Sequence, residues 1–187
     1  MYRFVLIAAL FFFQISCKEK EVAYTPLKKS AEDVTKDGII RHIVDSTYVA
    51  TFENDSLTSF YKMNGFKTVW NTSQARQLII EELSKADKEG LEPKDYNIYE
   101  LVRNEKKAPS LTEKEIANYD VQMTLSVQKY LTHLTRGKLN PKELYSDWDL
   151  TTNQAEINLL LTAAIAGDSL QTVIEKAKPN HIVYKRL

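Results

Sequence analysis

A long apolar repeat in the middle of the chain constrains the fold more than any other feature. Hydrophobic side chains recur every three or four positions, at Ile116, Tyr119, Met123, Val127, Tyr130 and Leu134. This is the period of one face of an α-helix, and the repeat continues for about six turns until Gly137. Ser110 and Glu113 have the spacing of a capping box, so we expect the helix to begin there.

Similar but shorter patterns precede this helix. Apolar residues at helical spacing and glycines at helix ends predict helices, and β-branched or aromatic runs predict extended chain. The resulting elements are a helix over 39–52, a helix capped by Asp55 and ended by Gly65, an extended piece over 66–70, a helix over 73–89 ended by Gly90, and a turn-rich connection over 91–99.

Two more helices are predicted after the long one. Thr151 and Gln154 form a capping-box pair, and the helix that follows should turn its apolar face inward, with Leu160, Leu161, Ala164 and Ile165 buried. Asp168 and Gln171 form a looser pair before the last helix, which Pro179 stops. Strand signals are few and short. The fold class is therefore mainly α, a helical domain with short extended segments.

The amino terminus has the pattern of an export signal. Arg3 is followed by ten apolar residues, Phe4 to Phe13, a run too short to span a bilayer but suited to the core of a signal peptide. Gln14-Ile15-Ser16-Cys17 then resembles a bacterial lipobox, in which cleavage precedes a cysteine that carries lipid. We expect lipidation at Cys17, and the alternative is an ordinary signal peptide.

The chain then divides into three regions. Residues 1–16 are predicted to be the signal peptide, 17–37 a flexible tether rich in charged and small polar residues, and 38–187 the helical domain. Loss of Arg3 with the signal leaves one more acidic than basic residue, so no basic field attracts nucleic acid. The lipid would attach the protein to a membrane of the cell envelope, facing the periplasm, or to the outer membrane of a Gram-negative cell.

The sequence offers no catalytic constellation, cofactor motif or metal site. His42, His133 and His181 are far apart, and no phosphate loop or dinucleotide fingerprint occurs. Asp147 and Asp149 flank Trp148 and invite a glycosidase interpretation, but residues two apart do not face each other on a helix, and capping of the next helix explains them more simply.

Several residues nevertheless occur in the order of a known family. From Phe60 to Leu187 the chain resembles the scaffold domain that precedes the catalytic domain in large bacterial L,D-transpeptidases of the YkuD superfamily. The similar positions are Phe60-Tyr61, Gly65-Phe66, Trp70, Ala86-Asp87, Glu89-Gly90-Leu91, Pro93, Asp95-Tyr96, Leu111, Tyr130, His133-Leu134, Gly137-Lys138, Pro141 and Asp147-Trp148.

The resemblance implies a non-catalytic part of a membrane-anchored enzyme that cross-links peptidoglycan. Such enzymes join peptide stems through a cysteine thioester, and the catalytic cysteine would lie in a downstream domain, because Cys17 is the only cysteine here. The pattern that begins at 182 stops after about two helical turns, which predicts a truncated piece of a longer enzyme. The alternative is a stand-alone lipoprotein that binds peptidoglycan or a protein partner through exposed aromatics such as Trp70 and Trp148, and a free-standing hydrolase ranks below both.

Overall fold

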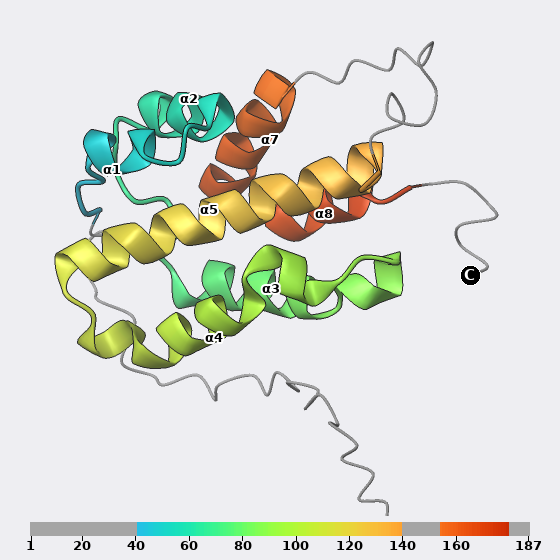
Figure 1. Cartoon of the computed structure of the whole chain (residues 1–187), viewed down its shortest axis with the longest axis horizontal. Helices are drawn as coiled ribbons and strands as arrows, with labels where there is room; N and C mark the ends of the chain where they lie inside the picture. The colour runs from blue at the N-terminus through green and yellow to red at the C-terminus, as the bar shows by residue number, and fades with distance from the viewer. Residues whose placement is uncertain (1–40, 140–153, 180–187) are drawn as a thin grey trace, which may run out of the picture.

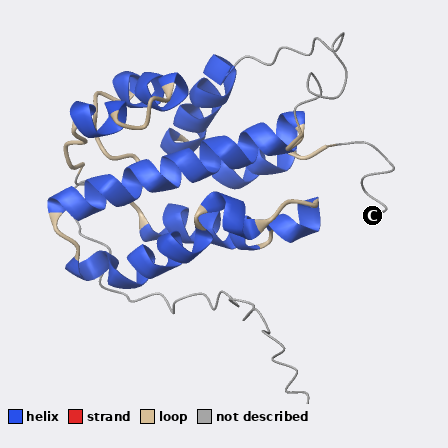
Figure 2. Cartoon of the chain, in the orientation of Figure 1, coloured by secondary structure: helices blue, strands red, loops and turns tan. Residues whose placement is uncertain are grey.

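The computed structural model describes residues 41–139 and 154–179. Within these ranges every regular element is a helix, and β pairing is confined to one antiparallel bridge between Ile43 and Lys67 (Figure 2). The predicted fold class, mainly α with short extended segments, is confirmed. The proposed signal peptide, the tether and the last residues of the chain lie outside the described ranges.

The predicted long helix is the centre of the domain. This helix, α5 (Glu113–Arg136), crosses the molecule, with α1, α2 and α7 on one side and α3 and α4 on the other (Figure 1). It contacts α3, α4, α7 and α8 directly. The surrounding helices are α1 (Ser46–Ala50), α2 (Asp55–Met63), α3 (Ser73–Ser84), α4 (Ile98–Lys107), α7 (Gln154–Ala166) and α8 (Leu170–Ala177).

The start of α5 lies two residues beyond the predicted one. Its capping box is formed by Thr112 and Glu115, with Thr112 N–H donating to Glu115 Oε2 over 2.8 Å. Ser110 instead belongs to the short 3₁₀ turn η3 (Ala108–Ser110), and its hydroxyl donates to the Lys107 carbonyl. Both pairs fit the capping-box spacing, so the preceding turn decides between them. Gly137 ends α5 at a φ of +84°, as predicted.

The predicted helix over 39–52 is mostly wrong. Of the part of this range that the structure describes, 41–52, only Ser46–Ala50 is helical, because the chain before it pairs with the segment around Lys67. Val44 N–H donates to the Phe66 carbonyl over 2.8 Å, and Thr68 N–H donates to the His42 carbonyl over 2.9 Å. The next helix is capped by the side chain of Asn54 and not by Asp55. The extended piece predicted over 66–70 is right only in part: Lys67 pairs with Ile43, but Phe66 lies in a turn with a left-handed φ of +49°.

Three other boundaries differ from the prediction. The helix expected over 73–89 ends at Ser84 and continues as a 3₁₀ turn, η1 (Ala86–Glu89), before Gly90 closes it at a φ of +70°. The connection over 91–99 contains a second 3₁₀ turn, η2 (Pro93–Tyr96), and then runs into α4, which the sequence pattern did not reveal. Asp168 does not cap α8, because its backbone is left-handed and α8 begins after Ser169.

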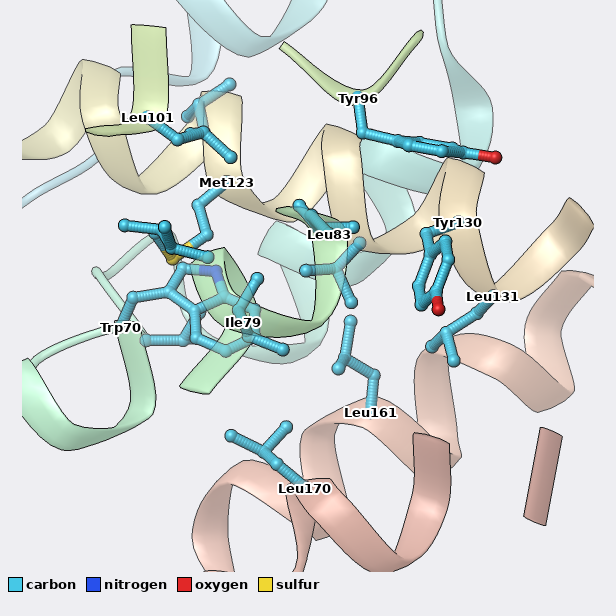
Figure 3. Close-up of a cluster of buried hydrophobic side chains, with 14 of the residues drawn as sticks. Trp70, Ile79, Leu83, Tyr96, Leu101, Met123, Tyr130, Leu131, Leu161 and Leu170 are labelled. Atoms are coloured by element: carbon cyan, nitrogen blue, oxygen red, sulfur yellow. The ribbon is translucent and has the colours of Figure 1, made fainter. Parts of the chain in front are cut away.

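The core lies where the helices meet α5. Figure 3 shows Met123 and Tyr130 of α5 among side chains from α3, η2, α7 and α8. The rings of Tyr96 and Tyr130 meet edge to face, with their centroids 5.2 Å apart. The predicted apolar face is confirmed for Tyr119, Met123, Val127, Tyr130 and Leu134, which are buried, and Ile116 at the end is half-buried.

The inward face of α7 is shifted from the predicted one. Leu161 and Ala164 are buried, but Leu160 is 49% exposed, so its predicted burial is wrong. Ile157, Leu161 and Ala164 are spaced by four and three residues, which places them on one face, and Leu160 falls beside it.

We expect Leu161→Ala to lower the free energy of unfolding by about 2–5 kcal/mol, because Leu161 is 1% exposed and its truncation leaves a cavity. Leu160→Ala is the matched control on the same helix and should change stability by about 0.5 kcal/mol or less. Urea unfolding followed by circular dichroism measures both. Equal losses would place the two leucines in equivalent surroundings.

Candidate functional site

A stripe of polar side chains runs along α5 next to its apolar face. Asp120, Thr124, Gln128 and Thr132 follow one another every fourth residue, so they lie on one side of the helix. We call these four residues the polar stripe. The first three are buried, and buried polar groups are retained where hydrogen bonds satisfy them. The hydrogen-bond partners of these side chains show which segments the polar stripe holds against α5.

Asp120 is the hydrogen-bond centre at the amino-terminal half of the stripe. Its Oδ1 accepts the Tyr61 hydroxyl over 2.6 Å, and its Oδ2 accepts the backbone N–H groups of Val69 and Trp70, each over 2.8 Å. Thr124 Oγ1 lies 3.0 Å from the Tyr61 hydroxyl and accepts the Trp70 indole N–H over 2.9 Å. The stripe therefore fixes α2 and the extended chain before α3 against α5.

The buried carboxyl group of Asp120 binds its proton more tightly than an aspartate in water does. Burial raises the pKa of Asp120 to about 6, while the hydrogen bonds from Tyr61, Trp70 and Val69 act in the opposite direction. Burial and the neighbouring Asp120 also raise the pKa of Tyr61 well above its ordinary value, so the phenol keeps its proton and remains a donor. The arrangement is suited to holding backbone in place.

Gln128 is the corresponding centre at the other half of the stripe. Its amide nitrogen donates to Asn158 Oδ1 of α7 over 2.7 Å, and Asn158 Nδ2 donates to the Ser56 carbonyl of α2 over 2.8 Å. These bonds fix the orientation of the Gln128 amide. Gln128 is only 3% exposed, yet its Oε1 has no hydrogen-bond partner among the described residues. A buried acceptor left without a donor costs free energy.

A cleft of about 430 Å³ lies beside Gln128. It is bounded by the start of α2, by the junction of η2 and α4, and by the surface of α5 between them. A cleft of this size is in the range that holds small ligands. The lining residues are Asn54, Ser56, Asp95, Asn97, Leu125, Ser126, Gln128, Lys129, Thr132 and His133.

The end of the cleft nearest the carboxyl terminus of α5 has both a basic and an acidic side chain. Lys129 is exposed and donates through Nζ to the Asp95 carbonyl over 2.9 Å. The Asp95 carboxylate lies 2.7 Å from Lys138 Nζ, and this contact holds its pKa below the ordinary value. The Asp95 carboxylate is therefore charged at neutral pH.

His133 supplies a neutral group between these charges. Its Nδ1 lies 2.8 Å from the hydroxyl of Tyr96, whose pKa burial and the Asp95 charge raise to about 12. Burial, with a smaller effect of Lys129, lowers the pKa of His133. The imidazole is thus uncharged near pH 7 and leaves Nε2 available as a hydrogen-bonding atom.

The structure tests only some of the residues that the sequence singled out. Cys17, Asp147, Trp148, Asp149 and His181 lie outside the described residues. Trp70 is 3% exposed and held by its indole N–H, so its use as an exposed binding aromatic is wrong.

The described ranges contain neither a metal-binding cluster nor a helix that could span a membrane. In residues 41–139 and 154–179 no three His, Cys, Asp or Glu side chains are grouped in a way that would hold a metal ion. No helix in the same ranges is long and apolar enough to cross a membrane.

Sequence reasoning missed both the stripe and the cleft. The stripe left a detectable signal, since four polar residues at a spacing of four lie beside the apolar face of α5 on the same side each time. The cleft left none, because Asn54, Asn97 and Lys129 come together only when α2, α4 and α5 pack. No local pattern joins residues from such distant parts of the chain.

Fold and site together define an all-helical domain organised around one long helix with buried polar anchors. A family model described as the scaffold domain matches residues 55–187, and the chain belongs to this family. No curated protein and no solved structure matches the chain.

Proposed function

We propose that this chain is the non-catalytic scaffold region of a membrane-anchored L,D-transpeptidase that cross-links peptidoglycan during cell-wall biogenesis. The observation that carries the proposal is the scaffold-domain match over residues 55–187. It is supported by the residues that resemble the L,D-transpeptidase scaffold in the same order, Phe60-Tyr61 and His133-Leu134 among them. The transfer step belongs to a cysteine in a downstream catalytic domain.

The packing around α5 suits such a role. A scaffold must hold its attached partner in one geometry, and buried hydrogen bonds between helices favour a single arrangement. Asp120 binds two consecutive backbone N–H groups of the extended chain before α3. Gln128 and Asn158 join α5, α7 and α2 in the same way. These contacts resist sliding of the helices, which apolar packing alone permits more readily.

The proposal is tested in the cell that carries the gene. Deletion is expected to reduce the fraction of cross-linked muropeptide dimers formed by L,D-transpeptidation, and the full coding sequence should restore them. Digestion of purified peptidoglycan followed by mass spectrometry measures the dimers. The purified chain of residues 17–187 alone is expected to form none from disaccharide tetrapeptides, because no catalytic thiol is present in the folded domain. An unchanged dimer fraction in the deletion strain would contradict the proposal.

Membrane attachment through Cys17 is a separate part of the proposal. We expect wild-type protein to incorporate labelled palmitate and to fractionate with membranes, because the thiol follows an export signal at the position of a lipobox cysteine. Cys17→Ala should lose the label. Several acyl chains make the attachment effectively permanent, since each buried methylene contributes about 0.8 kcal/mol. Equal labelling of the two proteins, or a mature terminus at another residue, would reject lipidation.

A second candidate function is a stand-alone cell-envelope lipoprotein that binds peptidoglycan or a protein partner. The polar cleft on α5 favours it, because a binding protein needs a recessed site and an enzyme scaffold does not. The coding sequence beyond Leu187 distinguishes the two functions. A coding sequence that continues past Leu187 into a domain with a cysteine near His and Gly supports the enzyme, and a stop codon there with no such domain supports the stand-alone protein.

A further inference from the structure

We infer that Asn64 and Gly65 form a site of spontaneous deamidation, and that the packing of α7 against α2 holds the reaction in check while the domain is folded. Asn64 is the single asparagine of the chain that is followed by glycine. It ends α2, and the pair lies in the turn between α2 and the chain that leads to Trp70. Such a site is independent of either proposed function.

The chemistry of this pair needs only the chain and water. The backbone nitrogen of Gly65 attacks Cγ of the Asn64 side chain, a bond between these two atoms forms, and the bond from Cγ to Nδ2 breaks. The amide NH2 leaves as ammonia with the proton of the Gly65 N–H, and a cyclic imide remains. Water then opens the imide to aspartate or to isoaspartate. Glycine favours the ring closure because it has no side chain to hinder the close approach of its backbone.

In the folded domain both reacting groups are engaged in hydrogen bonds. Asn64 Nδ2 donates to the Phe60 carbonyl over 2.8 Å and to Thr162 Oγ1 over 3.2 Å. The Gly65 N–H donates to the Lys62 carbonyl over 3.2 Å. Ring closure requires the Asn64 side chain to leave its two partners and the Gly65 nitrogen to leave the third. These hydrogen bonds therefore oppose the reaction.

Burial does not protect the pair. Gly65 and the two residues before Asn64 are exposed, and Asn64 itself is half-buried. A side-chain carbon added at Gly65 would meet no other atom within 4 Å. Water therefore has access to the turn, and the rate depends on how often the hydrogen bonds open, as it does for other locally fluctuating segments.

Thr162 is the part of this arrangement that α7 supplies. Helices α2 and α7 pack side by side (Figure 1), and Asn158 Nδ2 of α7 also donates to the Ser56 carbonyl near the start of α2. When α7 separates from α2, Asn64 loses Thr162 and only the local bonds of the last turn of α2 restrain it. Helix ends open more easily than helix centres. The contact with α7 is thus the tertiary contribution to the protection.

The product does not fit the same place as the amide. A carboxylate at position 64 has no N–H to donate to the Phe60 carbonyl, and its negative charge lies at the carboxyl end of α2, where the helix dipole disfavours an anion. The Thr162 hydroxyl can turn and donate to the carboxylate, so this contact survives in aspartate. Isoaspartate also adds a methylene to the backbone of the turn. Deamidation therefore loosens the last turn of α2.

The test follows the Asn64 amide in the purified chain of residues 17–187 at mildly alkaline pH. Peptide mapping by mass spectrometry detects the replacement of NH2 by OH, and the same chain unfolded in guanidinium chloride gives the unprotected rate. Asn64 is expected to react at least about tenfold more slowly in the folded chain, because several hydrogen bonds must open first. Equal rates in the two states, or an Asn64 that stays intact in the unfolded chain, would overturn the inference.

Two variants assign the protection to α7. Thr162→Val removes the hydroxyl acceptor and keeps the shape, and it is expected to speed deamidation of the folded chain by about threefold to tenfold, the factor that one hydrogen bond contributes. Thr162→Ser keeps the hydroxyl and is the matched control, with a rate near wild type. Melting curves verify that each variant is folded at the temperature of incubation. A folded Thr162→Val protein that reacts at the wild-type rate would show that α7 takes no part.

Asn64→Asp reproduces one product of the reaction. Hydrogen exchange of the backbone amides at 64–66, followed by mass spectrometry, is expected to be about threefold to tenfold faster than in wild type, because the Phe60 carbonyl loses a donor. Asn104→Asp makes the same replacement on α4 and is the control, which should leave exchange at 64–66 unchanged. Equal exchange in Asn64→Asp and wild type would contradict the loosening of α2.

Discussion

Arg76→Met is expected to lower the free energy of unfolding by about 3–5 kcal/mol, which is the cost of leaving a buried charge without its partner. Arg76 Nε lies 2.7 Å from Glu105 Oε2, and the carboxylate side chain is only 3% exposed. Arg76 also donates through Nη1 to the Trp70 carbonyl over 3.0 Å. Its loss would therefore leave a buried carboxylate and a backbone acceptor unsatisfied.

The remaining partners of Glu105 replace the arginine only in part. Ser73 donates through Oγ to Glu105 Oε1, and Tyr119 donates through its hydroxyl to Oε2, each over 3.0 Å. These are neutral donors, and they do not cancel the charge. They do position the carboxylate, so α3, α4 and α5 all meet at this residue.

A double variant separates the cost of an unpaired charge from the value of the pair. Arg76→Met with Glu105→Leu is expected to recover most of the lost stability, since replacing both members of a buried pair with apolar residues is often neutral. Lys85→Met is the surface control: its pair with Glu81 is about half exposed on both sides, and the change should be about 0.5 kcal/mol or less. Chemical unfolding of the four proteins measures the differences. A double variant as unstable as the single one would show that the pair itself contributes the stability.

The sequence predicts the α5 helix well because a single periodic signal specifies it. Met123, Val127, Tyr130 and Leu134 repeat without interruption, and burial follows the repeat. Helix α4 was missed for the opposite reason. Its buried face is narrow, and one of its buried residues is the charged Glu105, so an apolar count over residues 98–107 stays low. A charged residue at an inward position is recognisable only when its partner on another helix is known.

Capping residues show a second limit of sequence reasoning. Asn54, Thr112 and Asp45 cap α2, α5 and α1, while the sequence pattern favoured neighbouring residues with the same chemistry for two of these helices. Side chains that cap well are common near helix starts, and the backbone conformation before the helix decides which one is used. That conformation depends here on tertiary contacts such as the pairing of the chain around Ile43 and Lys67.

The cleft is beyond local sequence reasoning altogether. Taken alone, Gln128 looks like a solvent-facing residue of a long helix, and only the spacing of four that it shares with Asp120 and Thr124 marks it. Its burial follows from the packing of α7, where Asn158 occupies an inward position between Ile157 and Leu161. Two polar residues thus face each other across a helix interface, and their separation by 30 positions hides the match. A search for polar residues at regular spacing within apolar faces would find both members.

Asp120→Ala is the second change with a large expected effect, a loss of about 3–5 kcal/mol in the free energy of unfolding. The alanine removes the acceptor of three buried donors, the Tyr61 hydroxyl and the N–H groups of Val69 and Trp70, and each unsatisfied donor costs about 1–3 kcal/mol. Tyr61→Phe, which removes one donor and keeps the ring, should cost about 1–2 kcal/mol. Asp87→Ala replaces an exposed aspartate and is the control, with an expected change of about 0.5 kcal/mol or less.

The same carboxyl should make the stability of the domain depend on pH. The pKa of Asp120 is raised from 3.8 to about 6 in the folded protein, so between these values the folded chain holds a proton that the unfolded chain has lost. Asp120 therefore contributes about 3 kcal/mol to the free energy of unfolding below about pH 4, and this contribution is lost as the pH rises to about 6. Asp120→Asn cannot titrate. The difference in unfolding free energy between wild type and Asp120→Asn should thus be larger at pH 4 than at pH 7, and urea unfolding at several pH values measures it. A difference that is constant with pH, or larger at pH 7, would mean that the three hydrogen bonds outweigh burial and keep Asp120 ionised.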